Sequence, residues 1–252
     1  MGSGRPELGA VCAYASYLFD ATAKWNLALA VTTPSLVIFF YLFTYFQSLG
    51  DLLRALLTIT GMIYYLLSIN AVYIFTLDIS RGTSMVFLSQ PLTRRGYVAA
   101  WMLASVAAPA LAYALSFVVP LAILDATLLA HSDPQSYALL FLEGFTISMV
   151  VFHAGLLTKS PALVVALGAL LHILLPVVLA ALYSLLYYSQ SPAASASAEA
   201  VLFLLSFLYP FRSKLMVAGG HFEAGAYLSA LTAAALVLAA LAYATRRLEV
   251  AA

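Results

Sequence analysis

The sequence predicts an all-α integral membrane protein with six transmembrane helices, and two observations carry this prediction. Hydrophobic residues make up 64% of the 252-residue chain and charged residues only 8%, whereas a soluble domain carries roughly 25% charged residues. The apolar residues also form continuous runs of about 20 residues, the length that crosses a hydrocarbon core. We therefore expect a single transmembrane permease domain over residues 1–252, multi-pass in the cytoplasmic membrane of a cell.

The runs are bounded by charged residues, glycine or proline. The six predicted spans are 27–49, 52–77, 97–124, 137–158, 161–188 and 224–245. Each run is expected to be helical, because lipid offers no partner for backbone N–H and C=O groups. Strands of a membrane barrel would alternate between apolar and polar residues, and these runs do not.

The distribution of lysine and arginine predicts that both termini lie inside the cell. With the N-terminus inside, six spans return the C-terminus to the same side. Eight cations then lie inside (Arg5, Lys24, Arg81, Arg94, Arg95, Lys159, Arg246 and Arg247) and three outside (Arg54, Arg212 and Lys214). Such an excess of inner cations is typical of membrane proteins.

A short amphipathic segment precedes the first span. In residues 8–24, Tyr14, Tyr17, Leu18 and Ala21 follow helical spacing, with charged residues elsewhere on the wheel. The pattern predicts a helix lying in the inner membrane interface. The alternative is a frayed tail.

The segment 201–222, before the last span, predicts a re-entrant or interfacial hairpin on the outer side. Val201–Tyr209 is apolar but too short to cross a bilayer, and Pro210 breaks it before two cations and two glycines. The preceding residues 189–200 are small and polar, and we expect them to form a flexible loop.

The last span also carries small residues at intervals of four. One set is Gly225, Ser229 and Ala233, and the other is Ala226, Ala230 and Ala234. Small residues allow helix backbones to approach closely, so this span is expected to pack tightly on a neighbour.

The inner connection 78–95 is the most polar stretch of the chain. Gly82 permits a turn, Thr83–Ser89 can form two helical turns, and Pro91 stops them. Thr93 is a suitable N-cap for the third span. These signals predict a short helix across the inner mouth of a helix pair, tied at both ends.

This connection resembles the permease subunits of type-2 ABC exporters. In that family an acidic residue, a Gly-Thr and a Pro-x-x-Arg follow one another between spans two and three, and the matching positions here are Asp78, Gly82-Thr83 and Pro91–Arg94. The wider plan is also similar: an interfacial helix, six spans, a broken hairpin with Tyr209-Pro210, and a basic C-terminal Arg246-Arg247.

The resemblance implies a non-catalytic permease subunit of an ATP-driven exporter for a hydrophobic or amphipathic cargo. It implies a second permease subunit, identical or related, and ABC ATPase subunits that bind ATP and magnesium, since this chain is expected to bind no cofactor. The implied ATPase contact consists of Asp78, Arg81, Gly82, Thr83, Gln90, Pro91, Thr93, Arg94 and Arg95. Without the resemblance, the segment 78–95 is interpreted as an ordinary cytosolic connector between two spans.

Motifs of other function classes are missing from the sequence. Residues 155–160 superficially resemble a phosphate loop, but Thr158 replaces the required second glycine and no strand is expected before it. His153 and His172 lie on different spans without a third ligand nearby in sequence, so no metal site is expected. A net charge of +1 gives no basic field for nucleic acid.

Three polar residues inside the spans are candidates for a substrate path. Glu143 could instead snorkel to water or cap a partner helix. His172, one turn before Pro176, could bond a carbonyl that the proline frees, and Asn70 could join helices. The alternative function is a membrane-embedded substrate-binding subunit or secondary transporter without an ATPase, which would place such groups near the midplane.

Overall fold

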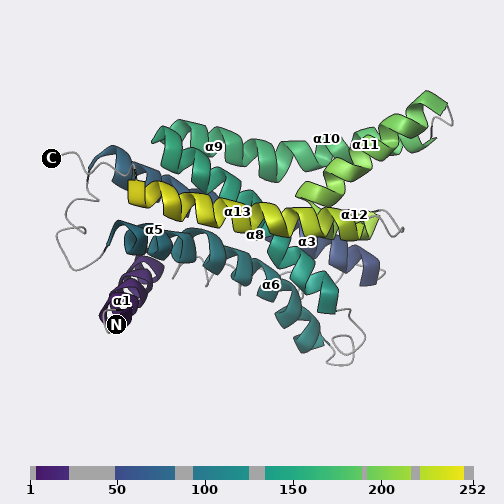
Figure 1. The fold of residues 1–252 in the computed structure, drawn as a ribbon. Helices are drawn as coiled ribbons and strands as arrows, with labels where there is room; N and C mark the ends of the chain where they lie inside the picture. Colours follow the sequence, from purple (N-terminus) through teal and green to yellow (C-terminus); the bar gives the residue numbers. More distant parts are fainter. Residues whose placement is uncertain are drawn as a thin grey trace.

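A computed structural model describes residues 4–22, 49–82, 93–124, 134–188, 192–216 and 222–246, and every regular element in these ranges is a helix (Figure 1). Five stretches are long and apolar enough to cross a membrane: Ile63–Ser80, Arg94–Ser116, Pro134–Thr158, Pro161–Leu186 and Glu223–Arg246. The all-helical class is therefore confirmed for the described residues, and five helices have the length and composition to cross a membrane. The predicted span 27–49 lies outside the described residues, so a total of six spans stays a prediction.

The helices follow the predicted apolar runs closely. In chain order they are α1 (Gly4–Thr22), α3 (Leu49–Ser80), α5 (Arg94–Met102), η1 (Leu103–Ala107), α6 (Ala108–Leu124), α8 (Pro134–Thr158), α9 (Pro161–Ala169), η2 (Leu170–Leu174), α10 (Leu175–Tyr188), α11 (Pro192–Leu208), α12 (Pro210–Met216) and α13 (Phe222–Arg246). The spans of α5–η1–α6 and of α9–η2–α10 are each interrupted by one π-helical turn.

Each π-helical turn lies just before a proline. The N–H of Ala108 bonds to the carbonyl of Leu103, and the N–H of Leu175 bonds to that of Leu170, five residues back in both cases. A proline follows one residue later in each span, and proline has no N–H to offer. The wider turn thus accommodates a break in the hydrogen-bond ladder, which in the second span is the break expected at Pro176.

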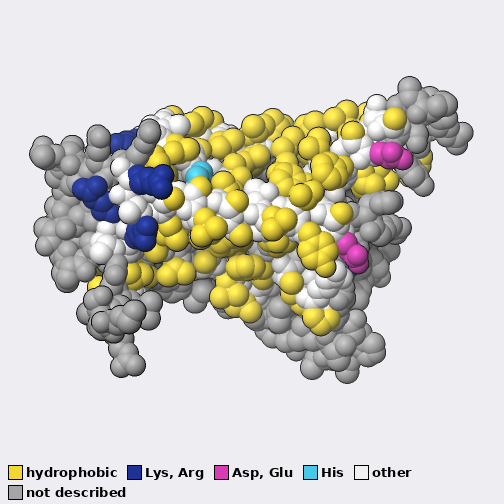
Figure 2. All heavy atoms as spheres, viewed as in Figure 1, with side chains coloured by type: hydrophobic (Ala, Val, Ile, Leu, Met, Phe, Trp, Pro, Cys, Tyr) yellow, Lys and Arg dark blue, Asp and Glu magenta, His cyan; other side chains and the backbone are white. Residues whose placement is uncertain are grey.

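Helix α8 lies at the centre of the described bundle and packs against α3, α6, α9, α12 and α13. At its end near the start of α5, the core is aromatic: Phe75 stacks on Phe152 with ring centroids 4.3 Å apart, and Trp101 lies 5.4 Å from Phe75. By contrast, α9, α10 and α13 expose many of their apolar side chains (Figure 2). Such an outward apolar surface is suited to lipid or to another membrane subunit.

Small residues set the closest helix contacts. A Cβ at Gly168 would overlap the side chain of Ile69, and one at Gly225 would overlap Ser206, so α9 meets α3 and α13 meets α11 at short range. Of the two small-residue sets in the last span, Gly225, Ser229 and Ala233 are buried, whereas Ala230 and Ala234 are exposed. Close packing is thus confirmed for the first set only.

Helix α1 packs across the start of α5, at one end of the bundle (Figure 1). Leu18 is buried, and Tyr14 stacks on Tyr97 with centroids 5.9 Å apart. The predicted helix is present and the frayed-tail alternative does not hold for residues 4–22, while its position in the membrane interface stays a prediction.

One sequence prediction is wrong. Residues 192–200, expected to be part of a flexible loop, form the first turns of α11. Pro192 occupies the first helical position, which suits a residue without an N–H, and alanine has the strongest intrinsic preference for helix. The small residues of this stretch therefore extend the apolar segment into a longer helix.

Candidate functional site

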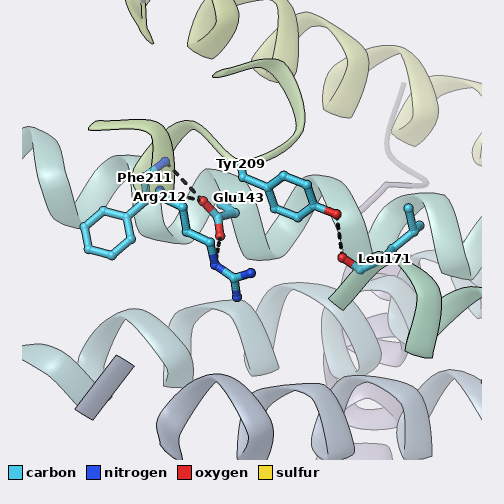
Figure 3. Close-up of polar contacts among 5 residues, drawn as sticks. All are labelled: Glu143, Leu171, Tyr209, Phe211 and Arg212. Atoms are coloured by element: carbon cyan, nitrogen blue, oxygen red, sulfur yellow. Dashed lines mark hydrogen bonds and ion pairs between the residues drawn. The ribbon is translucent and has the colours of Figure 1, made fainter. Parts of the chain in front are cut away.

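The connection between α11 and α12 is held by a carboxylate from α8 (Figure 3). Oε2 of Glu143 accepts hydrogen bonds from the backbone N–H groups of Phe211 and Arg212, both at 3.1 Å. The first N–H groups of a helix have no acceptor within the helix, and a negative charge near that end is stabilising. Glu143 therefore caps α12, which is one of the roles considered from the sequence.

The same carboxylate forms an ion pair with the side chain of Arg212. Glu143 Oε1 lies 3.1 Å from Arg212 Nε, and the two side chains are 3% and 25% exposed respectively. The Arg212 guanidinium also lies over the Tyr209 ring, 5.6 Å from its centroid. A buried carboxylate is very unfavourable unless it is paired and hydrogen-bonded, and here both oxygens have partners.

Depth makes this pairing more important. Glu143 lies nine residues after the start of α8 at Pro134, which corresponds to roughly 14 Å along the helix at 1.5 Å per residue. In a membrane crossed by α8, that distance would take the carboxylate into the hydrocarbon layer, which is about 30 Å thick. Ionisable residues at such depth face the protein interior and have partners, as Glu143 does.

A second contact joins the same connection to the π-helical turn η2. The hydroxyl of Tyr209 donates to the carbonyl of Leu171 at 2.6 Å. Continuing the five-residue pattern of η2 would pair this carbonyl with residue 176, but Pro176 has no N–H. Burial raises the pKa of the Tyr209 phenol, so the hydroxyl keeps its proton. Tyr209 thus supplies the hydrogen bond that the proline removes.

Tyr64 of α3 connects this region to the centre of the bundle. Its hydroxyl donates to the carbonyl of Gly144 at 2.7 Å and lies 2.6 Å from Oγ of Ser148, which is itself 2.6 Å from Oγ of Ser68. The Tyr64 ring stacks on Tyr113 with centroids 4.6 Å apart. Sequence reasoning missed Tyr64, although Gly144 and Ser148, one helical turn apart after Glu143, could have indicated a polar seam on α8.

His172 of η2 lies edge-on to two tyrosines of α3. Ring centroids are 5.5 Å apart for Tyr64 and 5.7 Å for Tyr65, and Nε2 of His172 is buried with no hydrogen-bond partner within the described helices. The prediction that His172 bonds the carbonyl freed by Pro176 is wrong, because Tyr209 takes that position. A role in a substrate path stays a prediction.

The predicted path residues do not all converge. Tyr64 links the surroundings of Glu143 and His172, since it bonds to the neighbour of one and contacts the ring of the other. Asn70, in contrast, is exposed on the surface of α3. An amide in that position needs a partner outside the described bundle.

At the opposite end of the bundle, the structure describes both flanks of the predicted ATPase contact. Asp78 lies in the last turn of α3, and Arg81 and Gly82 form the turn that follows it. Gly82 has a φ of +72°, a left-handed conformation that glycine adopts without strain. Thr83, Gln90 and Pro91 lie outside the described residues, and so does the short helix expected between the flanks.

The second flank begins at Thr93. Its hydroxyl accepts a hydrogen bond from the N–H of Gly96 at 3.1 Å, which confirms the predicted N-cap. Arg94 and Arg95 are exposed, and Nε of Arg95 donates to Oγ1 of Thr245 at 2.7 Å, joining α5 to α13. Figure 2 shows cationic side chains gathered at this end of the molecule and acidic ones at the other.

Comparison with known proteins finds no matching family model and no similar curated protein. Function is therefore argued from the residues and their arrangement. Among the residues that the structure describes, no three histidines, cysteines or acidic residues gather in a way that could hold a metal ion.

Proposed function

We propose that the chain is the permease subunit of an ATP-driven ABC transporter that exports a hydrophobic or amphipathic cargo. The observation that carries the proposal is the pair of capped helix ends around residues 83–92, at the cationic end of the bundle. In the proposed complex this short connection contacts separate ATPase subunits, which bind ATP and magnesium. A second permease subunit, identical or related, completes the pore.

The packing of α5 supports a mechanical role for its start. Tyr97 and Trp101 follow the Thr93 cap by one and two turns, and both are buried against Phe75. A push on Thr93 would reach the aromatic core directly, because packed interiors deform little. In the proposed cycle ATP binding favours one arrangement of the permease over another, which is the energetic condition for movement.

Helix α1 would move together with the start of α5. Tyr14 and Leu18 pack against the start of α5, so a displacement of α5 would carry α1 with it. The proposed ATPase contact therefore acts on two helices together. Arg246, at the end of α13, is exposed at the same end.

The first test is copurification from membranes in a mild detergent, where an ABC ATPase subunit should accompany the chain. The variant Arg94→Glu should reduce the recovered ATPase at least tenfold. Arg94 is the better choice of the two arginines because Arg95 also bonds within the chain.

Two controls separate docking from folding. Thr245→Val removes the intrachain partner of Arg95 and should leave the ATPase bound. Lys159→Glu makes the same charge change at an exposed residue outside the contact and should also leave it bound. An ATPase that remains with the Arg94→Glu variant, or its absence from the unmodified chain, contradicts the proposed docking.

A secondary transporter without an ATPase is the second candidate, and η2 favours it. This span is interrupted near its middle, and the buried Nε2 of His172 has no hydrogen-bond partner within the described residues. Interrupted spans with polar groups near the midplane are common in such transporters. This candidate requires uptake of cargo by vesicles that contain the chain alone and are energised by an ion gradient, whereas the exporter requires the ATPase.

A further inference from the structure

Four consecutive residues join the outer hairpin, α11 and α12, to two different parts of the bundle. Tyr209 bonds to the Leu171 carbonyl of η2, and the N–H groups of Phe211 and Arg212 bond to Glu143 of α8, which also pairs with the Arg212 side chain (Figure 3). We propose that these contacts form a releasable latch that holds the hairpin closed against α8 and η2.

The contacts are positioned where a movement of the hairpin must break them. Tyr209 is the single non-helical residue between α11 and α12, so it lies at the point about which the two helices turn relative to one another. A rotation of α12 away from α8 would separate three donors from one carboxylate at once. The hairpin latch, meaning Tyr209–Arg212 with Glu143 and Leu171, thus acts as one unit.

The physical chemistry of the carboxylate makes the latch discrete. Within the membrane an unpaired charge is very unfavourable, so intermediate positions of α12, with the carboxylate ionised, dry and without its donors, are disfavoured. The hairpin either stays docked or moves far enough for water to reach Glu143. Packed elements with two such arrangements switch between them rather than deforming gradually.

The latch is also accessible to release. The Arg212 side chain is 25% exposed, although its carboxylate partner is 3% exposed, so the guanidinium lies at the surface of the described helices. The ion pair joins Glu143 Oε1 to Nε of Arg212 at 3.1 Å. A buried carboxylate whose cationic partner lies at the surface can separate from it without unfolding the helices that bear the two groups.

Apolar contacts of the hairpin divide between two parts of the core. Phe211 packs near Tyr64 and Leu140, while Tyr209 and Leu205 pack near Ile147 and Leu179. These apolar contacts give the docked position its shape. In the proposed latch the polar contacts, which are directional, select the rotation of α12.

The experiment measures how well a buried residue of α12 is protected from a reagent in water. Ser213 is 1% exposed, and Ser213→Cys places a thiol there with little change in shape. The single native cysteine, Cys12, is exposed and is removed by Cys12→Ser. The full chain in lipid nanodiscs is treated with a membrane-impermeant maleimide, and each rate is normalised to labelling in denaturant.

The latch predicts a rate increase of at least tenfold in Glu143→Gln. The glutamine amide oxygen can still accept from the backbone of α12, so this variant removes the charge pairing and keeps a cap. Arg212→Gln should give a similar increase, and the double variant should add little to either. Tyr209→Phe, which removes one hydroxyl and keeps the ring, should increase the rate about threefold.

One control removes an acidic charge outside the latch, and a second places the reporter thiol at a buried position elsewhere in the bundle. Glu223→Gln removes an exposed acid in the first turn of α13, and its rate should equal that of the unmodified chain. A second reporter, Ser105→Cys, is fully buried in η1 and should stay protected in every latch variant.

Two results would overturn the inference. If Ser213→Cys stays protected in both Glu143→Gln and Tyr209→Phe, apolar packing alone holds the hairpin. If Ser105→Cys becomes labelled together with Ser213→Cys, the substitutions loosen the whole bundle and no separate latch exists. Neither result depends on an ATPase, so the latch can fail while the proposed transporter function stands, and the reverse is also true.

Discussion

Gly144 occupies a position where a methyl group has no room. A Cβ there would lie 2.9 Å from the hydroxyl oxygen of Tyr64 and 3.1 Å from its ring. The tyrosine cannot easily retreat, because it bonds to Ser148 and stacks on Tyr113. The contact between α3 and α8 therefore depends on the missing side chain at Gly144, and also on that at Gly155, where a Cβ would overlap the Thr76 side chain.

We predict that Gly144→Ala destabilises the bundle by about 1–2 kcal/mol, since overpacking typically costs about 1–3 kcal/mol and alanine recovers up to about 1 kcal/mol of helix preference. Unfolding in mixed detergent micelles measures the change. Gly9→Ala in α1, where a Cβ would meet nothing within 4 Å, is the matched control and should not destabilise. A fully stable Gly144→Ala would show that Tyr64 can move.

The polar residues of the site could be found from the sequence, but their partners could not. Glu143 is recognisable in the sequence as a charge inside a span, with a helix cap among its possible roles, and Pro176 as a ladder break that frees a carbonyl. Their partners, Arg212 and Tyr209, lie 69 and 38 residues from the groups they bind. A single sequence carries no pairing information over such distances, because burial and charge predict the need for a partner and not its identity.

At the scale of elements, apolar length predicted the helices well and composition predicted the connections poorly. An apolar run in lipid must form its backbone hydrogen bonds within itself, so it forms a helix. Helix α5 even begins at the predicted Thr93 cap. The composition of the stretch before Val201 is compatible with a flexible loop and with a helix, since alanine and serine occur in both. Docking of α11 against α10 and α13 selects the helix, and docking is not visible in local composition.

The π-helical turn η2 gives a second test at this scale. Pro176→Ala restores a backbone N–H that can reach the Leu171 or His172 carbonyl, so the Tyr209 hydroxyl is no longer the only available donor. We predict that Tyr209→Phe costs about 1 kcal/mol in the unmodified chain, the usual size of one net hydrogen bond, and less than half of that in the Pro176→Ala background. Unfolding midpoints of the four proteins measure the coupling. Equal costs in both backgrounds would mean that Tyr209 does not substitute for the missing N–H.

At the scale of the whole molecule, charge divides the described bundle into two ends: Figure 2 shows cationic side chains gathered at one end and acidic ones at the other. Exposed cations lie at helix ends and turns, namely Arg81, Arg94, Arg95, Lys159 and Arg246, whereas Glu199 of α11 and Glu223 of α13 are exposed acids. The excess of cations near one surface is the feature that orients membrane proteins.

We predict that the cationic end lies inside the cell. Single-cysteine variants Arg246→Cys and Glu199→Cys, in the Cys12→Ser background, place thiols at exposed positions of opposite ends. A membrane-impermeant maleimide applied to intact cells should label Glu199→Cys and leave Arg246→Cys unlabelled until the cells are opened. The reverse pattern would invert the topology and move the proposed ATPase contact to the wrong side.

The capping of α12 by α8 also bears on how the chain is made. Glu143 leaves the ribosome 69 residues before the Arg212 with which it pairs, an interval of roughly 3–14 s at ordinary rates of synthesis. During that time the carboxylate must be protonated, hydrated or sheltered by the insertion machinery. Emergence of residues 209–212 ends this wait, so the carboxylate of Glu143 is fully paired only when the hairpin arrives.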